Sequence, residues 1–205
     1  MPVGDPRELL VAITKTLDKL KIPYIITGGM AVLVWGRPRF TADIDIVIEF
    51  QKQGIDVLRK ALLSLGKHGY IDRDAMESAL ETEGEFNFIH GDSGVKVDFW
   101  ALKKMDDFDR QRFKRKKAKT ILGSRVYFTS PEDLILVKLK WHKQSGSPRQ
   151  LEDVESVVKI SGKKLNFDYL KKSAAAIGVS DILENLLNDK CYCGSGKKYK
   201  KCHGM

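Results

Sequence analysis

The sequence predicts an α+β fold, in which a mixed sheet flanked by helices is followed by a helical subdomain and a short cysteine-containing tail. Three observations lead to this prediction. Apolar runs of strand length alternate with amphipathic helical stretches up to residue 129, whereas only helical spacing follows Ser130. All three cysteines lie in the last fifteen residues. We therefore divide the chain into residues 1–129, 130–188 and 189–205.

The N-terminal elements follow from capping residues, turn residues and apolar spacing. Asp5 and Pro6 mark a helix start, and leucines and isoleucines then recur at helical spacing until Pro23. The next expected elements, in order, are a strand at 24–27, a Gly28-Gly29 turn, a helix at 30–35, a strand at 43–48, a helix at 56–64, and a hairpin of strands at 86–89 and 95–99.

Helical elements dominate the second part of the chain. A last strand pair, at 121–122 and 126–128, flanks Gly123-Ser124. Ser130 then opens a capping signature for an apolar helix. The expected helices cover residues 134–141, 150–159, 167–176 and 181–187.

Composition and charge narrow the class of protein. The chain has 205 residues, 42% of them hydrophobic, and no stretch reaches the roughly 18 apolar residues of a membrane span. The first residues lack the basic head and apolar stretch of a signal peptide, so we expect a cytoplasmic protein that does not enter membranes. The 36 Lys and Arg residues against 27 acids give a net charge of +9, which suits a partner such as nucleic acid or nucleotide phosphates.

Two carboxylates on one predicted strand are the first chemical signal. Residues two apart in a strand point to the same face, so Asp43 and Asp45 project together while Ile44 faces the core. Neighbouring carboxylates resist ionisation together unless a cation lies between them, and such oxygen ligands suit Mg²⁺ or Mn²⁺. Asp98 lies between apolar residues of another strand, where a shared metal site would supply the partner that a buried acid needs. The alternative is a solvated edge strand.

The Gly28-Gly29 pair is the second signal. Glycine lets the backbone approach a phosphate closely, and the start of the following helix presents N–H groups and a positive dipole end. A Gly-Gly pair alone is also an ordinary turn. The combination of glycines, two carboxylates and a third carboxylate, in this order, favours a catalytic site.

These residues resemble the DNA polymerase β-type nucleotidyltransferase superfamily. The matching segments are Thr27-Gly28-Gly29, Asp43-Ile44-Asp45 and Val97-Asp98-Phe99, with Thr27 standing where an apolar residue is commoner. The resemblance implies transfer of a nucleoside monophosphate from an NTP to a hydroxyl acceptor, with release of pyrophosphate. It implies that Asp43, Asp45 and Asp98 are catalytic and hold Mg²⁺ or Mn²⁺, and that Gly28 and Gly29 bind phosphates.

The helical part carries a narrower resemblance. The segment 130–139, Arg149 and the segment 151–154 are similar to the helical part of small prokaryotic nucleotidyltransferase-like proteins, which include toxin-type members related to type IV toxin–antitoxin systems. In this setting Lys138 is the first candidate to neutralise charge on the bound nucleotide, and Arg39 is the second. The alternative for Lys138 is a solvated helix position.

The tail resembles the SEC-C zinc motif almost residue for residue, with Tyr192 in place of the usual proline. Cys191, Cys193, Cys202 and His203 form a closed set of soft ligands, which favours a structural, tetrahedral Zn²⁺. Such motifs are small binding appendages for proteins or nucleic acid. The alternative is a redox-active or idle tail.

Two basic stretches bear on the identity of the acceptor substrate. Seven of the ten residues in the segment 110–119 are basic, and the tail adds four lysines in the segment 197–201. These stretches favour RNA, such as tRNA, as the acceptor, with a solvated surface as the alternative for the first of them. Two rival functions remain open: a non-catalytic, antitoxin-like module that binds a protein or nucleic acid, and modification of a small molecule such as an antibiotic.

Overall fold

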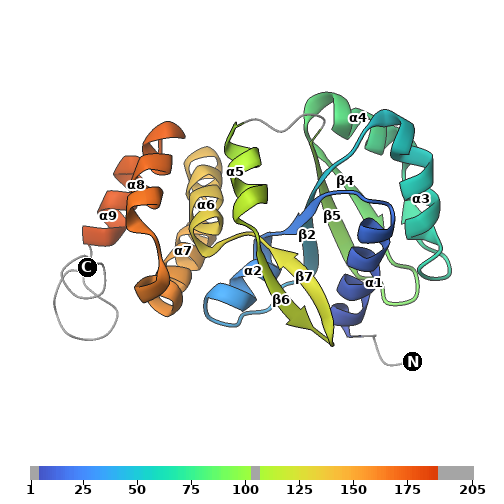
Figure 1. Cartoon of the computed structure of the whole chain (residues 1–205), viewed down its shortest axis with the longest axis horizontal. Helices are drawn as coiled ribbons and strands as arrows, with labels where there is room; N and C mark the ends of the chain where they lie inside the picture. Colours follow the sequence, from blue (N-terminus) through green and yellow to red (C-terminus); the bar gives the residue numbers. More distant parts are fainter. Residues whose placement is uncertain (1–4, 103–106, 189–205) are drawn as a thin grey trace. The chain divides into compact units, whose positions relative to one another are not determined.

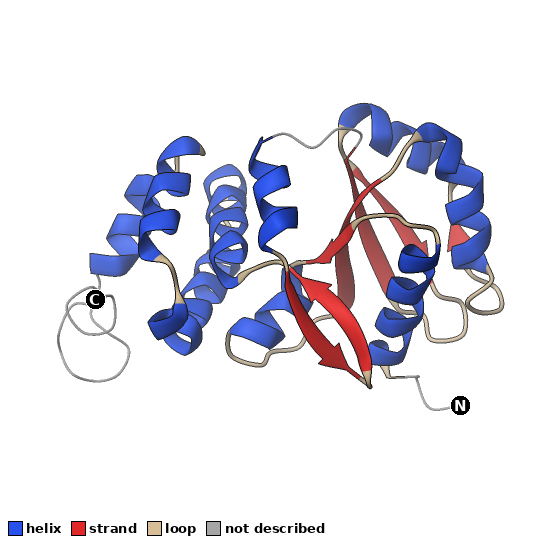
Figure 2. Ribbon diagram, viewed as in Figure 1, coloured by secondary structure: helices blue, strands red, loops and turns tan. Residues whose placement is uncertain are grey.

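The computed structural model describes residues 5–102 and 107–188, and Figure 2 shows their secondary structure. The helices are α1 (Pro6–Lys19), α2 (Gly28–Trp35), α3 (Ile55–Leu63), α4 (Arg73–Thr82), α5 (Asp107–Arg115), α6 (Pro131–Ser145), α7 (Pro148–Ser161), α8 (Phe167–Ala176) and α9 (Ser180–Asn188). The strands are β1 (Tyr24–Ile26), β2 (Asp43–Glu49), β3 (Tyr70–Ile71), β4 (Glu85–Ile89), β5 (Lys96–Leu102), β6 (Lys117–Ile121) and β7 (Ser124–Phe128).

The strands form one mixed, seven-stranded sheet in the order β3-β4-β5-β2-β1-β7-β6, which confirms the predicted α+β class (Figure 1). Strand β2 pairs in parallel with β5, and β1 pairs in parallel with β7. The other pairings, including both predicted hairpins, are antiparallel. Strand β2 is therefore the central strand of the sheet.

The two faces of this sheet differ in chemistry. Alternate residues of the central strands, such as Ile46, Val97 and Phe99, are fully buried. Helix α4 packs against β4 and β5, and α3 packs against α1 and α4. The other alternate residues of β2, β4 and β5 are mostly polar and partly exposed. A strand presents its side chains to both faces in turn, so one face builds the core and the other displays polar groups.

The chain divides into two compact units. The first contains residues 1–30 and 40–129, with the whole sheet, and the second contains residues 31–39 and 130–205. The predicted boundary after residue 129 coincides with a unit boundary, but residues 31–39 group with the helical part. Within the second unit α6 packs against α7 and α8, and α8 packs against α9.

Some elements differ from the expectation. The Gly28-Gly29 pair does not form a separate turn, because the two glycines are the first residues of α2. Helices α4 and α5 and the two-residue strand β3 were not expected as such. No helix in the described part of the chain has the length and hydrophobicity that a membrane crossing requires.

Candidate active site

The polar face of the sheet brings the three predicted carboxylates onto neighbouring strands. Asp43 and Asp45 lie on the same side of β2, and the register of β2 with β5 places Asp98 opposite Asp45. Asp98 is only 6% exposed. Because β2 is the central strand, the alternative of a solvated edge strand for Asp43 and Asp45 is wrong.

Each carboxylate has a local hydrogen-bond donor. Thr41 Oγ1 donates to Asp43 Oδ1 at 3.0 Å, and the backbone N–H of Gly29 donates to Asp45 Oδ2 at 3.4 Å. The ammonium of Lys96 lies 2.8 Å from Asp98 Oδ2. The loop before β2, the start of α2 and strand β5 thus orient the three side chains.

Gly28 is required by the close approach of α2 to β2. Its φ of +56° lies in the left-handed region, which favours glycine. A Cβ atom added at this position would lie 1.8 Å from Asp45 Oδ2, which is far inside contact distance. At Gly29 the corresponding distance is 2.2 Å, to Thr41 Oγ1. The two glycines therefore allow the helix start to lie directly against the carboxylates.

The residues present fit a divalent cation such as Mg²⁺ or Mn²⁺. All three side chains offer hard oxygen donors, and Asp98 Oδ1 is buried without a hydrogen-bond partner among the described residues. In the described part of the chain, no three His, Cys, Asp or Glu side chains are already gathered as a metal site. The donors thus occupy neighbouring positions on β2 and β5, and each carboxylate has a local hydrogen-bond or ion-pair partner.

Lys96 is a site residue that the sequence analysis missed. The hydrogen bond from Lys96 to Asp98 raises the pKa of the ammonium, burial opposes this, and the charges of Asp98, Asp43 and Glu85 add to the rise. Lys96 therefore carries its charge at neutral pH. The available signal was its position two residues before Asp98 on a strand, which puts both side chains on one face.

The two predicted nucleotide-binding cations, Arg39 and Lys138, meet in the second unit. Arg39 Nε lies 2.6 Å from Asp153 Oδ1, and Lys138 Nζ lies 2.7 Å from Asp153 Oδ2. The Lys138 side chain is 5% exposed and its ammonium lies 5.5 Å from the centre of the Trp141 ring, so the alternative of a solvated helix position is wrong.

Asp153 is the anion of this cluster. Burial would raise the pKa of its carboxyl, but hydrogen bonds from Arg39 and Lys138, together with their charges, lower it below the ordinary value. The cluster joins the segment 31–39 to α7, where Ser156 Oγ also accepts a hydrogen bond from the Arg37 backbone at 2.5 Å. The carboxylates of β2 and β5 belong to the first unit, and this cluster belongs to the second.

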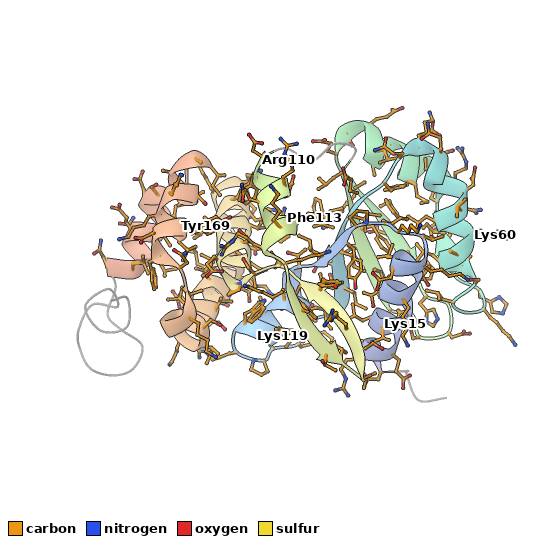
Figure 3. The ribbon with its side chains drawn as sticks, in the orientation of Figure 1. Lys15, Lys60, Arg110, Phe113, Lys119 and Tyr169 are labelled. Atoms are coloured by element: carbon orange, nitrogen blue, oxygen red, sulfur yellow. The ribbon has the colours of Figure 1, made fainter. Side chains whose placement is uncertain are left out.

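Several side chains of the basic segment 110–119 contact other residues of the protein. Arg110, Phe113 and Lys119 of this segment are labelled in Figure 3. Arg110 pairs with Asp107, and the buried Arg112 pairs with Asp109. The Lys116 ammonium lies 4.2 Å from the centre of the Tyr127 ring. Lys114 and Lys117 remain as exposed lysines of this stretch.

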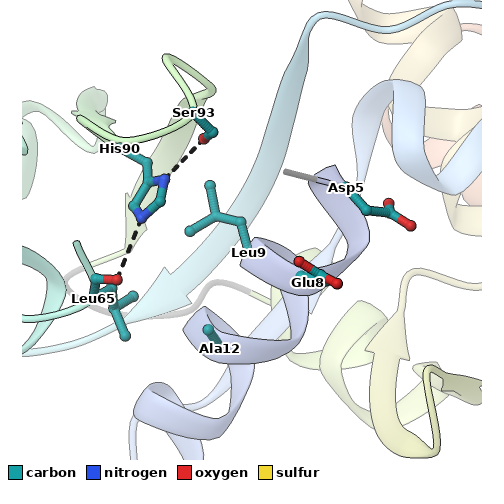
Figure 4. A pocket seen from close by; sticks show the side chains of 7 residues that line it. All are labelled: Asp5, Glu8, Leu9, Ala12, Leu65, His90 and Ser93. Carbon is teal, nitrogen blue, oxygen red and sulfur yellow. Dashed lines mark hydrogen bonds between the residues drawn. The ribbon is translucent and has the colours of Figure 1, made fainter. Parts of the chain in front are cut away.

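A separate hollow of about 190 Å³ lies beside α1 and is lined by Leu9, Leu65 and His90, among others (Figure 4). His90 Nδ1 is 2.8 Å from Ser93 Oγ, and His90 Nε2 is 3.3 Å from the carbonyl oxygen of Leu65. The imidazole thus ties a hairpin turn to the end of α3.

The predicted zinc ligands Cys191, Cys193, Cys202 and His203 lie outside the described residues. A family model for the SEC-C motif matches residues 188–204. The tail therefore carries a SEC-C motif, as its residues indicated.

The family model described as nucleotidyl transferase of unknown function (DUF2204) matches residues 7–187. The chain belongs to this family. The glycines, the Asp43-Ile44-Asp45 strand and Asp98 all lie within the matched region. The predicted enzyme class, a nucleotidyl transferase, is thus confirmed.

Solved structures show the same fold. ANT(2'')-Ia in complex with adenylyl-2''-tobramycin has a TM-score of 0.57 and 16% identity, over 84% of this chain and 97% of that chain. An antigenic nucleotidyltransferase-like protein from Paracoccidioides brasiliensis has a TM-score of 0.56 and 21% identity, over 90% and 93%. The lincomycin-bound lincosamide antibiotic adenylyltransferase LnuA has a TM-score of 0.51 and 16% identity, over 77% and 98%.

The curated relatives that match include one that is similar over a short stretch. The protein translocase subunit SecA of Koribacter versatilis is 33% identical over 70 residues, which make up 30% of this chain. The chain spans only 7% of the length of that relative.

Proposed function

We propose that this nucleotidyl transferase moves a nucleoside monophosphate from an NTP to a hydroxyl group and releases pyrophosphate, with a divalent metal held by Asp43, Asp45 and Asp98. The observation that carries this proposal is the register of β2 with β5, which puts three carboxylates on one face beside the glycines of α2. Membership of the nucleotidyl transferase family supports the reaction class.

The roles of the residues follow from their positions. Bound Mg²⁺ or Mn²⁺ would supply positive charge for the triphosphate and for the developing alkoxide. Asp43 and Asp45 would hold the metal and orient it from β2. The backbone N–H groups at the start of α2, which the glycines leave accessible, would bind phosphate oxygens. The buried oxygen of Asp98 would accept the proton of the attacking hydroxyl.

Arg39 and Lys138 remain predicted nucleotide-binding residues. Arg39 and Lys138 both contact the carboxylate of Asp153, so two positive charges lie close together in the second unit. Paired cations of this kind suit a phosphate ligand. A loss of NTP affinity in Lys138→Met, measured at a temperature at which the variant is fully folded, would support this role.

For the acceptor we propose RNA, such as tRNA, on the basis of the net charge of +9 and the exposed lysines of β6 and α5. A small molecule is the second candidate, because the similar structures include one with adenylyl-2''-tobramycin and one with lincomycin. A cytoplasmic location and a place in a toxin–antitoxin pair are parts of the same proposal. A protein acceptor would appear as label on protein in the assay below.

The test is transfer of label from each of the four α-labelled NTPs to total cellular RNA, to cell lysate and to an aminoglycoside and a lincosamide. We expect label on RNA and one pyrophosphate released per transfer, both abolished by a metal chelator. Asp45→Asn should abolish transfer at an unchanged melting temperature, because charge in the site is lost but packing is kept.

The matched control is Asp74→Asn, an identical change at an exposed position of α4, and it should transfer at the parent rate. Full turnover of Asp45→Asn, or of the parent protein in chelator, would contradict metal-assisted transfer. Label on neither RNA, protein nor antibiotic would favour the non-catalytic, antitoxin-like alternative.

A further inference from the structure

Lys96 lies among the three carboxylates of the site. It stands opposite Asp43 in the register of β2 with β5, and it precedes Asp98 by two residues on the same face. Its ammonium is 2.8 Å from Asp98 Oδ2, and its side chain is 46% exposed whereas that of Asp98 is 8% exposed. The lysine therefore reaches from the solvent side to a carboxylate that is itself buried.

This contact gives Asp98 a cationic partner within the protein. Lys96 holds one oxygen of Asp98, and the other oxygen is buried without a hydrogen-bond partner in the described part of the chain. Asp43 and Asp45 have their own donors at Thr41 and Gly29. Because Asp98 Oδ1 is buried, a cation reaches Asp98 through Oδ2, where it must take the place of the Lys96 ammonium or turn the carboxylate away from it.

We infer that Lys96 is a positioning residue, a built-in counter-ion that occupies Asp98 until a divalent cation displaces it, and that it thereby sets the metal affinity of the site. This inference rests on the proposed function, in which Asp43, Asp45 and Asp98 hold the metal. Lys96 lowers the affinity of the site for a metal ion in two ways. The ion pair with Asp98 must be broken, and the positive charge of Lys96 then stays near the incoming cation and repels it. A half-exposed ion pair is weak, so the competition stays modest and the metal can win.

The test is direct binding of Mn²⁺, measured from the electron paramagnetic resonance signal of the unbound ion, with no nucleotide present. Lys96→Met should bind Mn²⁺ about three- to ten-fold more tightly than the parent, because the competing ammonium is gone. Lys96→Gln should behave in the same way, and Lys96→Arg, which keeps the counter-ion, should stay within about two-fold of the parent. The control is Lys60→Met, which removes the same charge from the exposed side of α3 (Figure 3).

A double-mutant cycle with Asp98→Asn separates competition for Asp98 from a general effect of charge. When Asp98 is replaced, Lys96→Met should no longer tighten Mn²⁺ binding. An equal gain in both backgrounds would overturn the inference, and so would an unchanged affinity in Lys96→Met.

Mn²⁺ binding by Asp43→Asn tests the proposed function separately. If this variant binds Mn²⁺ as tightly as the parent protein, the proposed metal site is wrong and the inference is wrong with it. If Asp43→Asn does reduce binding while Lys96→Met leaves it unchanged, the metal site stands and only the role of Lys96 is wrong.

Discussion

At the scale of single residues, the site depends on where side chains are missing as well as on where they are present. Gly28 and Gly94 both have a positive φ, of +56° and +69°. An added Cβ at Gly28 would overlap Asp45, whereas one at Gly94 would meet nothing within 4 Å. The two glycines thus share a backbone requirement, but only Gly28 has the additional requirement that the site imposes.

Gly28→Ala should therefore reduce nucleotidyl transfer at least about 100-fold, because its Cβ displaces the Asp45 carboxylate by more than the reaction tolerates. Gly94→Ala is the matched control, since it adds the same methyl group at a similar φ and meets open space. It should lose about 1 kcal/mol of stability and keep its turnover. Steady-state rates and melting temperatures of both variants decide the matter, and equal turnover in the two would disprove a role for the close approach.

The parts of the site that depend on local sequence could be predicted, whereas those that depend on contacts between distant segments could not. Asp43 and Asp45 were assigned to one face from the period of a strand, a local rule that holds wherever the strand lies. The contact between Gly28 and Asp45 depends on how α2 meets β2, and the opposition of Asp98 to Asp45 depends on a parallel pairing. Such long-range register is not encoded in local periodicity, and for the same reason Lys96 was missed.

At the scale of elements, capping signals predicted the starts of α1 and α6 but missed α4, which the side chain of Asp72 caps. Asp5 caps α1 and Ser130 caps α6, each through its side-chain oxygen, as their sequences indicated. Helix α5 is mostly polar and buries Arg112 rather than an apolar stripe, so its sequence shows mainly a basic run. Strand β3 has two residues and exists through its pairing with β4. Helix α5 and strand β3 were thus not expected, because neither has an apolar pattern long enough to predict it.

The contact between segment 31–39 and α7 includes the ion pair of Arg39 with Asp153, so it depends on charge. Because hydrogen bonds from Arg39 and Lys138 lower the pKa of Asp153, the carboxylate stabilises the fold above its unfolded pKa and loses this effect as pH falls through the folded pKa. Asp153→Asn should lower the free energy of unfolding by about 3 kcal/mol at pH 7, because it removes the anion that the buried Lys138 and the partly buried Arg39 both contact. Urea unfolding should show the difference from the parent shrinking below about pH 4.

Glu152→Gln, on the exposed side of the same helix, is the control for the loss of one acidic charge. Its free energy of unfolding should stay within about 0.5 kcal/mol of the parent at every pH. A pH-independent gap between Asp153→Asn and the parent would show that shape, and not charge, accounts for the effect.

At the scale of the whole molecule, the chain combines a family domain with a separate SEC-C tail. The family model for the nucleotidyl transferase ends at residue 187, and the SEC-C match begins at residue 188. All three cysteines of the chain lie in the tail. The proposed zinc ligands and the proposed transfer residues are therefore different residues, and either set can be replaced without changing the other.

We predict one tightly bound zinc per chain, which Cys191→Ser combined with Cys202→Ser should remove, because a structural site does not tolerate loss of two thiolates. The melting temperature of the nucleotidyl transferase part should not change, since none of its residues is a proposed zinc ligand. Metal analysis of the purified protein measures the first effect and calorimetry the second. Ser195→Ala, within the same motif, is the control, and freshly purified protein without zinc would contradict the prediction.

A net charge of +9 favours a polyanionic partner such as RNA. A total charge does not by itself form a binding surface, and the structure shows that Arg110, Arg112 and Lys116 of the basic stretch already have internal partners. Lys114 and Lys117 are exposed on α5 and β6, so they are the members best placed to meet a phosphate backbone. Each contacted phosphate of a single strand contributes about −0.7 to the slope of log affinity against log salt.

Lys114→Gln combined with Lys117→Gln should therefore flatten the salt dependence of RNA binding by about 1.4, measured by fluorescence anisotropy from 50 to about 300 mM salt. Lys15→Gln combined with Lys60→Gln removes the same charge from exposed positions of α1 and α3 and should keep the parent slope, because only charges that touch the backbone release counterions. Equal slopes in all three proteins would show that the basic stretch is a solvated surface. An absence of RNA binding at the lowest salt would shift the assignment of the acceptor to a small molecule or a protein.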